Sequence, residues 1–599
     1  MKRVNIEVNG VNTEVNNVNI EVNGVNTEVN GVNAEVNSGN IAAITACAAC
    51  AALALALAAC GSSSPPAAQP SPPPAPPAQE PTMSTQPSPP APAAAPPTQT
   101  AKPQELAFPD EAFRAQQPAP GALHPFTLPP MQRFGLPSGI DVYLVEQHAL
   151  PIVSMDLNFD GGSLTDPAGK ESLAGLCMSL VTEGTQQLDK IQYAEALADV
   201  ASQINAYAAD DSQGVGLSTL TKHLDTTFAL FADTLREPGL RQSDFDRLIK
   251  RSIETVKQQR GNPAQIPGRV AGAILWGPQH PLGRVTTEAS LQAITLADCK
   301  QQIATWIKPK HARLFVVGDV TRPQLEALFA KSKLAGWTGA APKQPEPPPA
   351  KAPAGKIFFV NVPSAAQSSV LFLEHGPQRT APDYFASTVM SAVFGGGFTS
   401  RLNMNLREDK GYSYGARGGL QYSKHYGTLT ATAPVQTDST YQALLEIEHE
   451  LRALASGKQP VTKDELEREQ RNATLALPGK FATAQAALGQ YRSLVYFGLP
   501  LDYFNTYADK VGKVTLADVA HAATAHLRPD HGVFLVVGDG DAKMIVDDPS
   551  QPKDKRRVPY MKDGKQLTLR EALRDLAAKG DVGRGGLVEI DADGNAVAR

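Results

Sequence analysis

The stretch TLADCKQQIATWIKPKHARLFVVGD, Thr295 to Asp319, returns without a gap 220 residues later as TLADVAHAATAHLRPDHGVFLVVGD, Thr515 to Asp539. Each copy predicts a helix opened by Thr and Asp, then a proline-containing turn, then a strand of β-branched and aromatic residues. A repeat at this spacing indicates two consecutive domains of about 200 residues that share one fold. We place them at 130–338 and 356–545, joined by a proline-rich linker at 339–355.

Alternating apolar residues predict the strands of each half and, with them, the fold class. In the first half, Ile140 to Glu146 and Ile152 to Phe159 have this pattern, and helical patterns follow them. Strand runs grouped beside helix runs favour the α+β class. We therefore expect two tandem homologous α/β-sandwich domains, each with a mainly antiparallel sheet covered on one face by helices.

A C-terminal extension, 546–599, follows the second domain, and its role is left open. Lys562 to Leu576 predicts a strand and a short amphipathic helix, and the end of the chain predicts a hairpin with an Asp-Gly turn. The triplet Asp591, Asp593 and Asn595 has the residue types of a calcium loop. Gly594 is misplaced for an EF-hand, however, and no Glu follows, so calcium binding is not favoured.

Charge and cysteine content exclude two classes of protein. Lys and Arg number 55 against 60 Asp and Glu, a net charge of −5, and no long basic run occurs, so we expect no nucleic-acid partner. Five cysteines in 599 residues exclude a disulfide scaffold. Cys47, Cys50 and Cys60 lie in or at the end of one apolar segment, and we expect Cys177 and Cys299 to be ordinary thiols.

The first 125 residues predict no packed domain. Residues 1–40 are a low-complexity heptad repeat, five copies of a unit such as VNIEVNG, which is either a disordered extension or translated ahead of the true start. Its Asn and Gly content disfavours a coiled coil. The apolar segment 41–60 ends in Leu57-Ala58-Ala59-Cys60-Gly61, as a signal peptide does. Residues 61–125 form a Pro/Ala-rich linker.

The end of this apolar segment resembles the lipobox of bacterial lipoproteins, which are cleaved before the cysteine and acylated on it. The resemblance implies lipidation of Cys60, and Gly61 after it implies sorting to the outer membrane of a Gram-negative bacterium, with the body facing the periplasm. A transmembrane helix is the alternative, but about 19 alanine-rich residues are barely enough to span a bilayer.

The segment FGGGFTSRLNMNLREDKGYSYGA, Phe394 to Ala416, resembles the GGGxxSRLxxxLRExxGxxY segment of the insulinase or pitrilysin family of metallopeptidases, in a bacterial form similar to mitochondrial processing peptidase. Arg407 and Tyr414 match the family's Arg/Tyr pair. The resemblance implies that they donate hydrogen bonds to the scissile carbonyl and the adjacent substrate backbone. The alternative is a surface arginine beside Glu408 and an ordinary strand tyrosine.

The first half departs from the family at its zinc site. The segment ESLAGLCMSLVTEGT, Glu171 to Thr185, stands where active members carry AGLAHxxEHxxxxGT, in which two His bind zinc and the Glu activates the metal's water. The residues at the zinc positions and at the later acidic positions are Gly175, Met178, Ser179, Leu248 and Thr255. None of these side chains can do that chemistry, so we expect no metal and no cofactor in this chain.

The resemblance implies the non-catalytic subunit of a heterodimeric zinc metallopeptidase that degrades peptides or unfolded polypeptides. The expected partner is a homologous chain with an intact HxxEH motif, which would hold the zinc, and the chain alone would be inactive. An extended peptide substrate would add to a sheet edge near Asn205 to Leu220. The alternatives are a peptide-binding or scaffold protein without a catalytic role, and independent catalysis at a rebuilt metal site, which no other His/Glu cluster supports.

Overall fold

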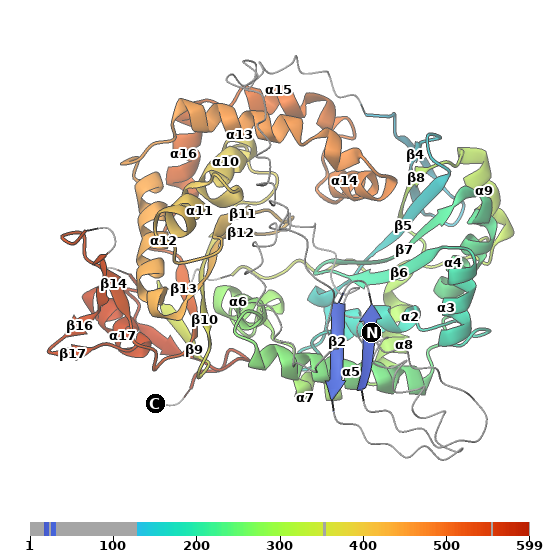
Figure 1. Cartoon of the computed structure of the whole chain (residues 1–599). Helices are drawn as coiled ribbons and strands as arrows, with labels where there is room; N and C mark the ends of the chain where they lie inside the picture. Colours follow the sequence, from blue (N-terminus) through green and yellow to red (C-terminus); the bar gives the residue numbers. More distant parts are fainter. Residues whose placement is uncertain are drawn as a thin grey trace, which may run out of the picture. The chain divides into compact units, whose positions relative to one another are not determined.

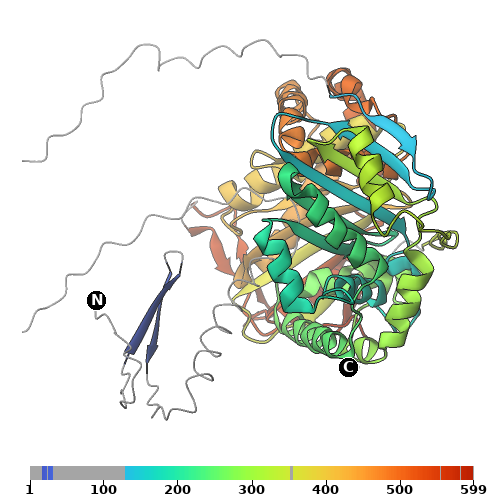
Figure 2. The same cartoon turned by 90° about the vertical axis from the view of Figure 1, so that its right-hand side faces the viewer.

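The computed structural model describes residues 17–22, 25–30, 128–350, 355–552, 555–580 and 582–597 (Figures 1 and 2). By its internal contacts the chain divides into two units, Met1–Pro118 and Ala119–Arg599. The predicted segments 41–60, which includes Cys60, and 61–125 lie outside the described residues. No helix within the described ranges has the length and apolar character needed to cross a membrane.

In the first unit, the structure describes an antiparallel pair of strands, β1 (Asn17–Val22) and β2 (Val25–Asn30). Inside each of these heptads, Val, Ile or Thr alternates with Asn or Glu, and alternation with a period of two is the pattern of a strand.

The first half of the second unit is built on a sheet with the strand order β3-β4-β8-β5-β7-β6. Its strands are β3 (Gln132–Gly135), β4 (Asp141–Glu146), β5 (Ile152–Asp160), β6 (Gln203–Ala208), β7 (Ser212–Leu220) and β8 (Arg313–Gly318). Its helices are α2 (Leu173–Val181), α3 (Lys190–Asp199), α4 (Leu224–Arg236), α5 (Gln242–Gly261), α6 (Ile266–Trp276), α7 (Glu288–Gln292), α8 (Leu296–Trp306) and α9 (Arg322–Lys331).

The second half is built on a sheet with the strand order β11-β12-β10-β13-β9-β18. Its strands are β9 (Ile357–Asn361), β10 (Gln367–Gly376), β11 (Arg417–Gln421), β12 (Gly427–Gln436), β13 (Val533–Gly538) and β18 (Leu587–Glu589). Its helices are α10 (Tyr384–Ser391), α11 (Arg401–Asn403), α12 (Thr440–Ala455), α13 (Lys463–Leu475), α14 (Ala484–Tyr496), α15 (Tyr507–Gly512) and α16 (Leu516–His526).

The two sheets share one topology, which confirms the α+β class and the duplication. The order β4-β8-β5-β7-β6 of the first sheet matches β9-β13-β10-β12-β11 of the second, and in each the only parallel pair of these five strands is the outer one, β4 with β8 and β9 with β13. The duplicated sequence forms α8 with β8 and α16 with β13. Thr295 and Thr515 each cap their helix, accepting the backbone N–H of Asp298 and Asp518 at 3.2 Å.

The second face of each sheet is apolar only in part, and in each sheet a helix from the other half packs against it. In the first half, β5 and β8 receive α14, and Phe315 and Val317 of β8 belong to the same buried cluster as Leu488 of α14. In the second half, β10 and β13 receive α6, whose Val270 packs in one cluster with strand residues such as Leu371 and Leu535 (Figure 1). The sequence predicted helices on one face of each sheet, which holds for the helices of the same half. It did not predict the helix from the other half on the second face.

An ion pair lies where α14 meets the first sheet; its carboxylate is buried, whereas 41% of the Arg492 side chain is exposed. The Arg492 guanidinium Nη1 on α14 is 2.7 Å from Oδ2 of Asp156 on β5, and the Tyr207 hydroxyl of β6 donates to the other oxygen of the same carboxylate at 3.0 Å. Burial raises the pKa of Asp156, whereas the guanidinium and the hydroxyl oppose that shift. A polar contact thus links the exchanged helix to a face of the sheet on which Ser154 and Asn158 of β5 are also buried.

The C-terminal extension completes the second sheet. Its elements are β14 (Ile545–Asp547), β15 (Arg557–Pro559), β16 (Met561–Lys562), β17 (Lys565–Gln566), α17 (Leu569–Lys579) and β18. Strand β18 pairs in parallel with β9, at the edge where β3 pairs with β4 in the first sheet. Leu569, Leu573 and Leu576 of α17 are buried in the core of the second half. The extension is therefore part of the folded body.

Replacing Arg492 with Ala tests the exchange of helices. The buried Asp156 carboxylate loses its guanidinium, and we expect the free energy of unfolding to fall by about 3 kcal/mol. Trp306 and Trp337 lie in the first half, and Trp276 on α6 packs against His375 and Tyr426 of the second half. Their fluorescence and far-UV circular dichroism should follow one urea transition, because neither half covers its own sheet completely.

The matched control is Arg471→Ala, an exposed arginine on α13, which should change the free energy of unfolding by no more than about 0.5 kcal/mol. Equal effects of the two substitutions, or two separate transitions for the wild-type chain, would contradict this account of the fold.

Candidate functional site

The positions that hold zinc in active relatives carry side chains that do not fit a metal. Met178 is buried, and the Ser179 hydroxyl donates to the Gly175 carbonyl oxygen at 2.9 Å, both within α2. On α5, the Thr255 hydroxyl donates to the Arg251 carbonyl oxygen at 3.0 Å. Leu248, at the second acidic position, is buried among apolar residues of α2 and α8. Nowhere in the described ranges do three or more His, Cys, Asp or Glu side chains form a group that could hold a metal ion.

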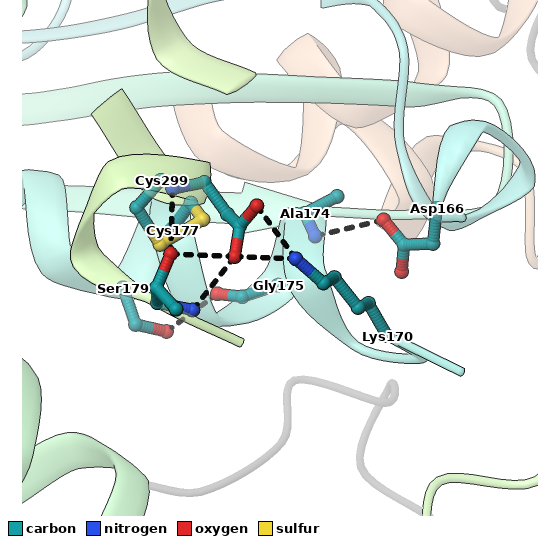
Figure 3. Close-up of a disulfide and its surroundings, with 9 residues drawn as sticks. Asp166, Lys170, Ala174, Gly175, Cys177, Ser179 and Cys299 are labelled. Carbon is teal, nitrogen blue, oxygen red and sulfur yellow. Dashed lines mark hydrogen bonds and ion pairs between the residues drawn. A yellow bond between two sulfur atoms is a disulfide. The ribbon is translucent and has the colours of Figure 1, made fainter. Parts of the chain in front are cut away.

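A disulfide joins α2 to α8 beside these positions. Cys177 and Cys299 are bonded, with their Cα atoms 4.9 Å apart, and both are fully buried (Figure 3). The expectation of two ordinary thiols was wrong. The bonded residues are 122 positions apart in the sequence, so only the tertiary packing of α2 on α8 reveals the pair. The cross-link lies one residue from Met178, in the helix that carries the zinc ligands of active relatives.

Asp166 caps the start of α2. Its Oδ1 accepts the backbone N–H of Ala174 at 2.9 Å, while Oδ2 is buried and has no hydrogen-bond partner within the described structure. Burial raises the pKa of Asp166 to about 7, and the backbone donors of α2 only partly oppose that shift. A carboxyl group that titrates near neutral pH therefore holds the N-terminus of the altered helix.

Arg407 and Tyr414 lie at two ends of one short turn in the second half. Arg407 belongs to a π-helical turn, Met404–Asp409, and its guanidinium carbon lies 5.0 Å from the centre of the Phe398 ring. Its Nε is 3.2 Å from the Glu408 carboxylate, and both side chains are partly exposed. Tyr414 is 82% exposed. Both predicted residues are thus accessible from outside the chain, one on each side of the turn.

Hydrogen bonds of the backbone fix this turn. The Leu406 carbonyl oxygen accepts the N–H groups of Tyr412 and Ser413 at 2.9 and 3.3 Å, and the Arg407 carbonyl oxygen accepts that of Gly411 at 3.2 Å. Because these bonds close the chain between the two predicted residues, Tyr414 is held next to the end of the turn that carries Arg407.

Asn403 is a site residue that the sequence did not indicate. It is buried, its amide nitrogen donates to the Phe398 carbonyl oxygen at 2.7 Å, and its amide oxygen accepts the Ala416 N–H at 3.1 Å. It therefore ties the loop after the glycine run to the strand that follows Tyr414. An asparagine in a helical stretch usually indicates a solvent-facing residue, so a single sequence gives no signal for this role. Phe398, against which the Arg407 guanidinium lies, is 58% exposed, and Met404 is 42% exposed.

The corresponding edge strands of the two sheets differ in accessibility. At β11, the Ser391 hydroxyl accepts the outward N–H of Leu420 at 3.0 Å, and Asn403 accepts that of Ala416 just before the strand. At β6, by contrast, the backbone makes no hydrogen bond beyond its pairing with β7 in the described part of the chain. The segment Asn205 to Leu220 was expected to form an edge, but only its β6 part does, since β7 lies between β5 and β6.

The acidic triplet near the C-terminus binds protein groups. Asp593 accepts a hydrogen bond from the buried Arg269 guanidinium at 2.6 Å and pairs with Arg260 at 3.2 Å. Asp591 accepts the backbone N–H groups of Asp593 and Asn595, each at 2.9 Å. These contacts attach the end of the chain to α5 and α6.

Two family models match the chain, that of insulinase (peptidase family M16) at residues 141–269 and that of the peptidase M16 inactive domain at 293–473. The chain is 22% identical over 409 residues to the non-peptidase homolog YmxG of Helicobacter pylori, which covers 67% of this chain and 92% of that protein. It is 24% identical over 307 residues to an uncharacterized zinc protease of Mycobacterium leprae, which covers 50% of this chain and 68% of that one.

Solved structures show the same fold. A peptidase M16 inactive domain from Pseudomonas fluorescens superposes with a TM-score of 0.62 at 24% identity, over 68% of this chain and 98% of that one. A protease from Helicobacter pylori superposes with a TM-score of 0.63 at 18% identity, over 68% of this chain and all of that one. Together with the residues at the zinc positions, these findings support a non-catalytic, peptidase-like protein.

Replacing Cys177 and Cys299 together with Ala should lower the free energy of unfolding by about 2–4 kcal/mol, because the disulfide restricts a long loop of the unfolded chain. Urea denaturation with and without dithiothreitol measures this. The wild-type chain should lose stability in the reductant, and the double variant should not respond to it. The matched control, Cys47→Ala with Cys50→Ala, should keep the wild-type response, and a response in the Cys177/Cys299 variant would contradict the prediction.

Asp166→Asn should remove a pH dependence of stability. The pKa of Asp166 is raised to about 7 in the folded chain, so between about pH 4 and pH 7 the folded state binds a proton that the unfolded state has lost. This group therefore lowers the free energy of unfolding as the pH rises through that interval. Asn keeps the oxygen that accepts the Ala174 N–H but carries no charge.

We therefore expect Asp166→Asn to be more stable relative to wild type at pH 8 than at pH 5, as measured by urea denaturation at both values. Other groups that titrate in this range, such as Glu374, are common to both proteins and cancel in the comparison. A difference that is the same at both pH values would show that Asp166 does not titrate as described.

Proposed function

The chain belongs to the insulinase family of peptidases, family M16, and we propose that within it this chain is the non-catalytic subunit of a two-chain zinc peptidase. The partner would be a homologous chain with an intact HxxEH motif, and the substrate a peptide or unfolded polypeptide. One combination of observations carries the proposal. The zinc positions hold Gly175, Met178, Ser179 and Thr255, whereas Arg407 and Tyr414 are kept and face outward.

Arg407 and Tyr414 offer hydrogen-bond donors suited to a peptide backbone. The guanidinium lies against the Phe398 ring, which restricts its orientation and leaves N–H groups at its rim for an acceptor. Its ion pair with Glu408 is exposed and therefore weak, so a substrate carbonyl can compete for it. The phenol of Tyr414 is a second donor with no part in the core. Such donors stabilise the negative charge that develops on a carbonyl oxygen during attack.

The first half offers a place for an extended peptide. Because the outward backbone groups of β6 make no hydrogen bond within the described structure, a peptide strand can add to this edge. At the equivalent edge, the Leu420 N–H of β11 is already bonded to Ser391 and the Ala416 N–H before the strand to Asn403, so addition of a strand is disfavoured there. This chain would bind the substrate backbone at β6, and the partner would supply the metal and activate the water.

The disulfide supports a location outside the cytoplasm. Buried disulfides such as Cys177–Cys299 form and persist in oxidising compartments, of which the periplasm is one. We place the chain there, anchored by lipid on Cys60 to the outer membrane, with the proline-rich segment as a tether. The peptide-binding or scaffold role remains the second candidate, because the open edge of β6 needs no metal to hold a peptide.

Arg407→Ala and Tyr414→Phe, co-expressed with an HxxEH partner, test the proposal. We expect the wild-type pair to cleave an unstructured peptide with about one zinc per heterodimer, and each variant to reduce kcat/KM by about 100-fold while the complex still forms. Peptide cleavage, zinc content and size-exclusion chromatography measure these outcomes. The control is Arg471→Ala, the exposed arginine of α13, which should keep wild-type activity.

Two results would reject the proposal. Unchanged cleavage by Arg407→Ala would remove the assigned role of the Arg/Tyr pair. Failure to form a complex, together with peptide binding by the chain alone, would instead favour the scaffold function.

A further inference from the structure

The hairpin that opens the C-terminal extension packs against the turn between Arg407 and Tyr414. In the register of β14 with β15, Asp547 lies opposite Arg557. The Arg557 guanidinium carbon is 5.9 Å from the centre of the Tyr412 ring. On the same turn, Lys410 Nζ lies 3.8 Å from Oδ2 of Asp547 and 3.4 Å from Glu446 on α12. The two residues of the hairpin's cross-strand pair thus face the turn: Asp547 faces Lys410, and Arg557 faces Tyr412.

Tyr412 is the residue on which this turn depends. It is 2% exposed and ranks among the largest fully buried side chains of the described structure. Its N–H donates to the Leu406 carbonyl oxygen at 2.9 Å, and its carbonyl oxygen accepts the Gln436 N–H at 3.0 Å. Leu406 precedes Arg407, and Tyr412 lies two residues before Tyr414. Movement of the Tyr412 ring would therefore displace both exposed donors.

Arg557 connects the hairpin to the end of β12 as well. Its guanidinium donates to Oε1 of Gln436 at 3.3 Å and to Oδ1 of Asp438 at 3.1 Å, and it also bonds the Ser439 hydroxyl. Gln436 is the residue whose backbone holds Tyr412. One guanidinium therefore fixes the Tyr412 ring and the strand end to which the Tyr412 backbone is bonded.

The hairpin itself is anchored from behind. Tyr560, next to β15, packs against the tilted ring of Tyr441 on α12 with the ring centres 4.7 Å apart, and its hydroxyl donates to Asp575 of α17 at 2.8 Å. The Met544 N–H donates to the Leu567 carbonyl oxygen at 3.0 Å. Because α17 is buried in the core and β18 closes the sheet edge, the hairpin is a fixed support for the turn.

We infer that the C-terminal extension is a brace for the Arg407–Tyr414 turn, in which Asp547 and Arg557 are positioning residues that hold the two donors in place through Tyr412. The consequence for peptide cleavage rests on the function proposed above, whereas the brace itself does not. Burial and the nearby Asp547 carboxylate raise the pKa of Tyr412 above its usual range, so its hydroxyl stays neutral.

Hydrogen exchange followed by mass spectrometry tests the brace in the full chain without a partner. In Arg557→Ala, amides of residues 404–416 should exchange about tenfold faster than in wild type, because the turn opens locally when its support is lost. Exchange elsewhere in the second half should stay as it is. The control, Arg574→Ala, breaks an exposed pair with Glu589 at 2.8 Å in the same extension and should leave residues 404–416 unchanged.

A second variant covers the case in which Arg557→Ala destabilises the whole chain and exchange rises everywhere. Asp547→Asn keeps the shape of the side chain and the β14–β15 pairing but removes the charge that faces Lys410 and Arg557. Faster exchange confined to residues 404–416 would support the brace. Wild-type exchange there, in a folded Asp547→Asn or Arg557→Ala variant, would overturn it.

Kinetics of the assembled complex separate the brace from the proposed function. Arg557→Ala should lower kcat by about tenfold with little change in KM, since the donors are misplaced but the peptide edge at β6 is untouched. Arg557→Lys, which keeps the cation over Tyr412, should recover part of kcat and part of the exchange protection. Faster exchange with unchanged kcat would keep the brace and reject a role for Arg407 and Tyr414 in cleavage.

Discussion

Each half of this protein builds a sheet whose second face, apolar in part, is not covered by that half's own helices. The exchange of α6 and α14 resolves this, because each helix packs on the second face of the other half's sheet. The ion pair of the buried Asp156 with Arg492 links one of the two helices to its sheet. Each half therefore needs a helix of the other half to bury the apolar part of its sheet, and the two copies form one folded body. Residues outside these contacts can differ between the two copies.

The altered zinc helix shows how far such divergence can go. In α2, Met178 faces apolar neighbours, and Leu173, Leu176 and Leu180 pack with residues of α5 and α8. The disulfide from Cys177 to Cys299 adds a covalent link between α2 and α8. A helix held by apolar contacts and a cross-link needs no metal to stay in place, which explains how the fold persists without the ligands.

Local sequence patterns predicted what local physics decides. The repeated Thr-Leu-Ala-Asp start forms a capping box in both α8 and α16, and the alternating runs form β4 and β5. The partner of Cys177, the role of Asn403 and the exchange of α6 with α14 depend on contacts between residues far apart in the chain. The role of the C-terminal extension was not predicted for the same reason, since nothing in its sequence indicates that β18 pairs with β9 or that Arg557 lies over Tyr412. Patterns along a single sequence do not indicate contacts between residues that are far apart in the chain.

The two halves have lost and kept complementary features. The first half has an open strand edge at β6 and no side chains that could hold a metal at the family's positions. The second half has side-chain partners for the N–H groups of Leu420 and Ala416 at its β11 edge, and it presents two donors on a turn that the C-terminal hairpin supports. Donors alone cannot attack a peptide bond, because they lower the energy of a charge that another group must create. Two exposed donors on one half and an open strand edge on the other therefore fit the proposed role, in which a second chain supplies the attacking group, whereas a scaffold needs only the edge.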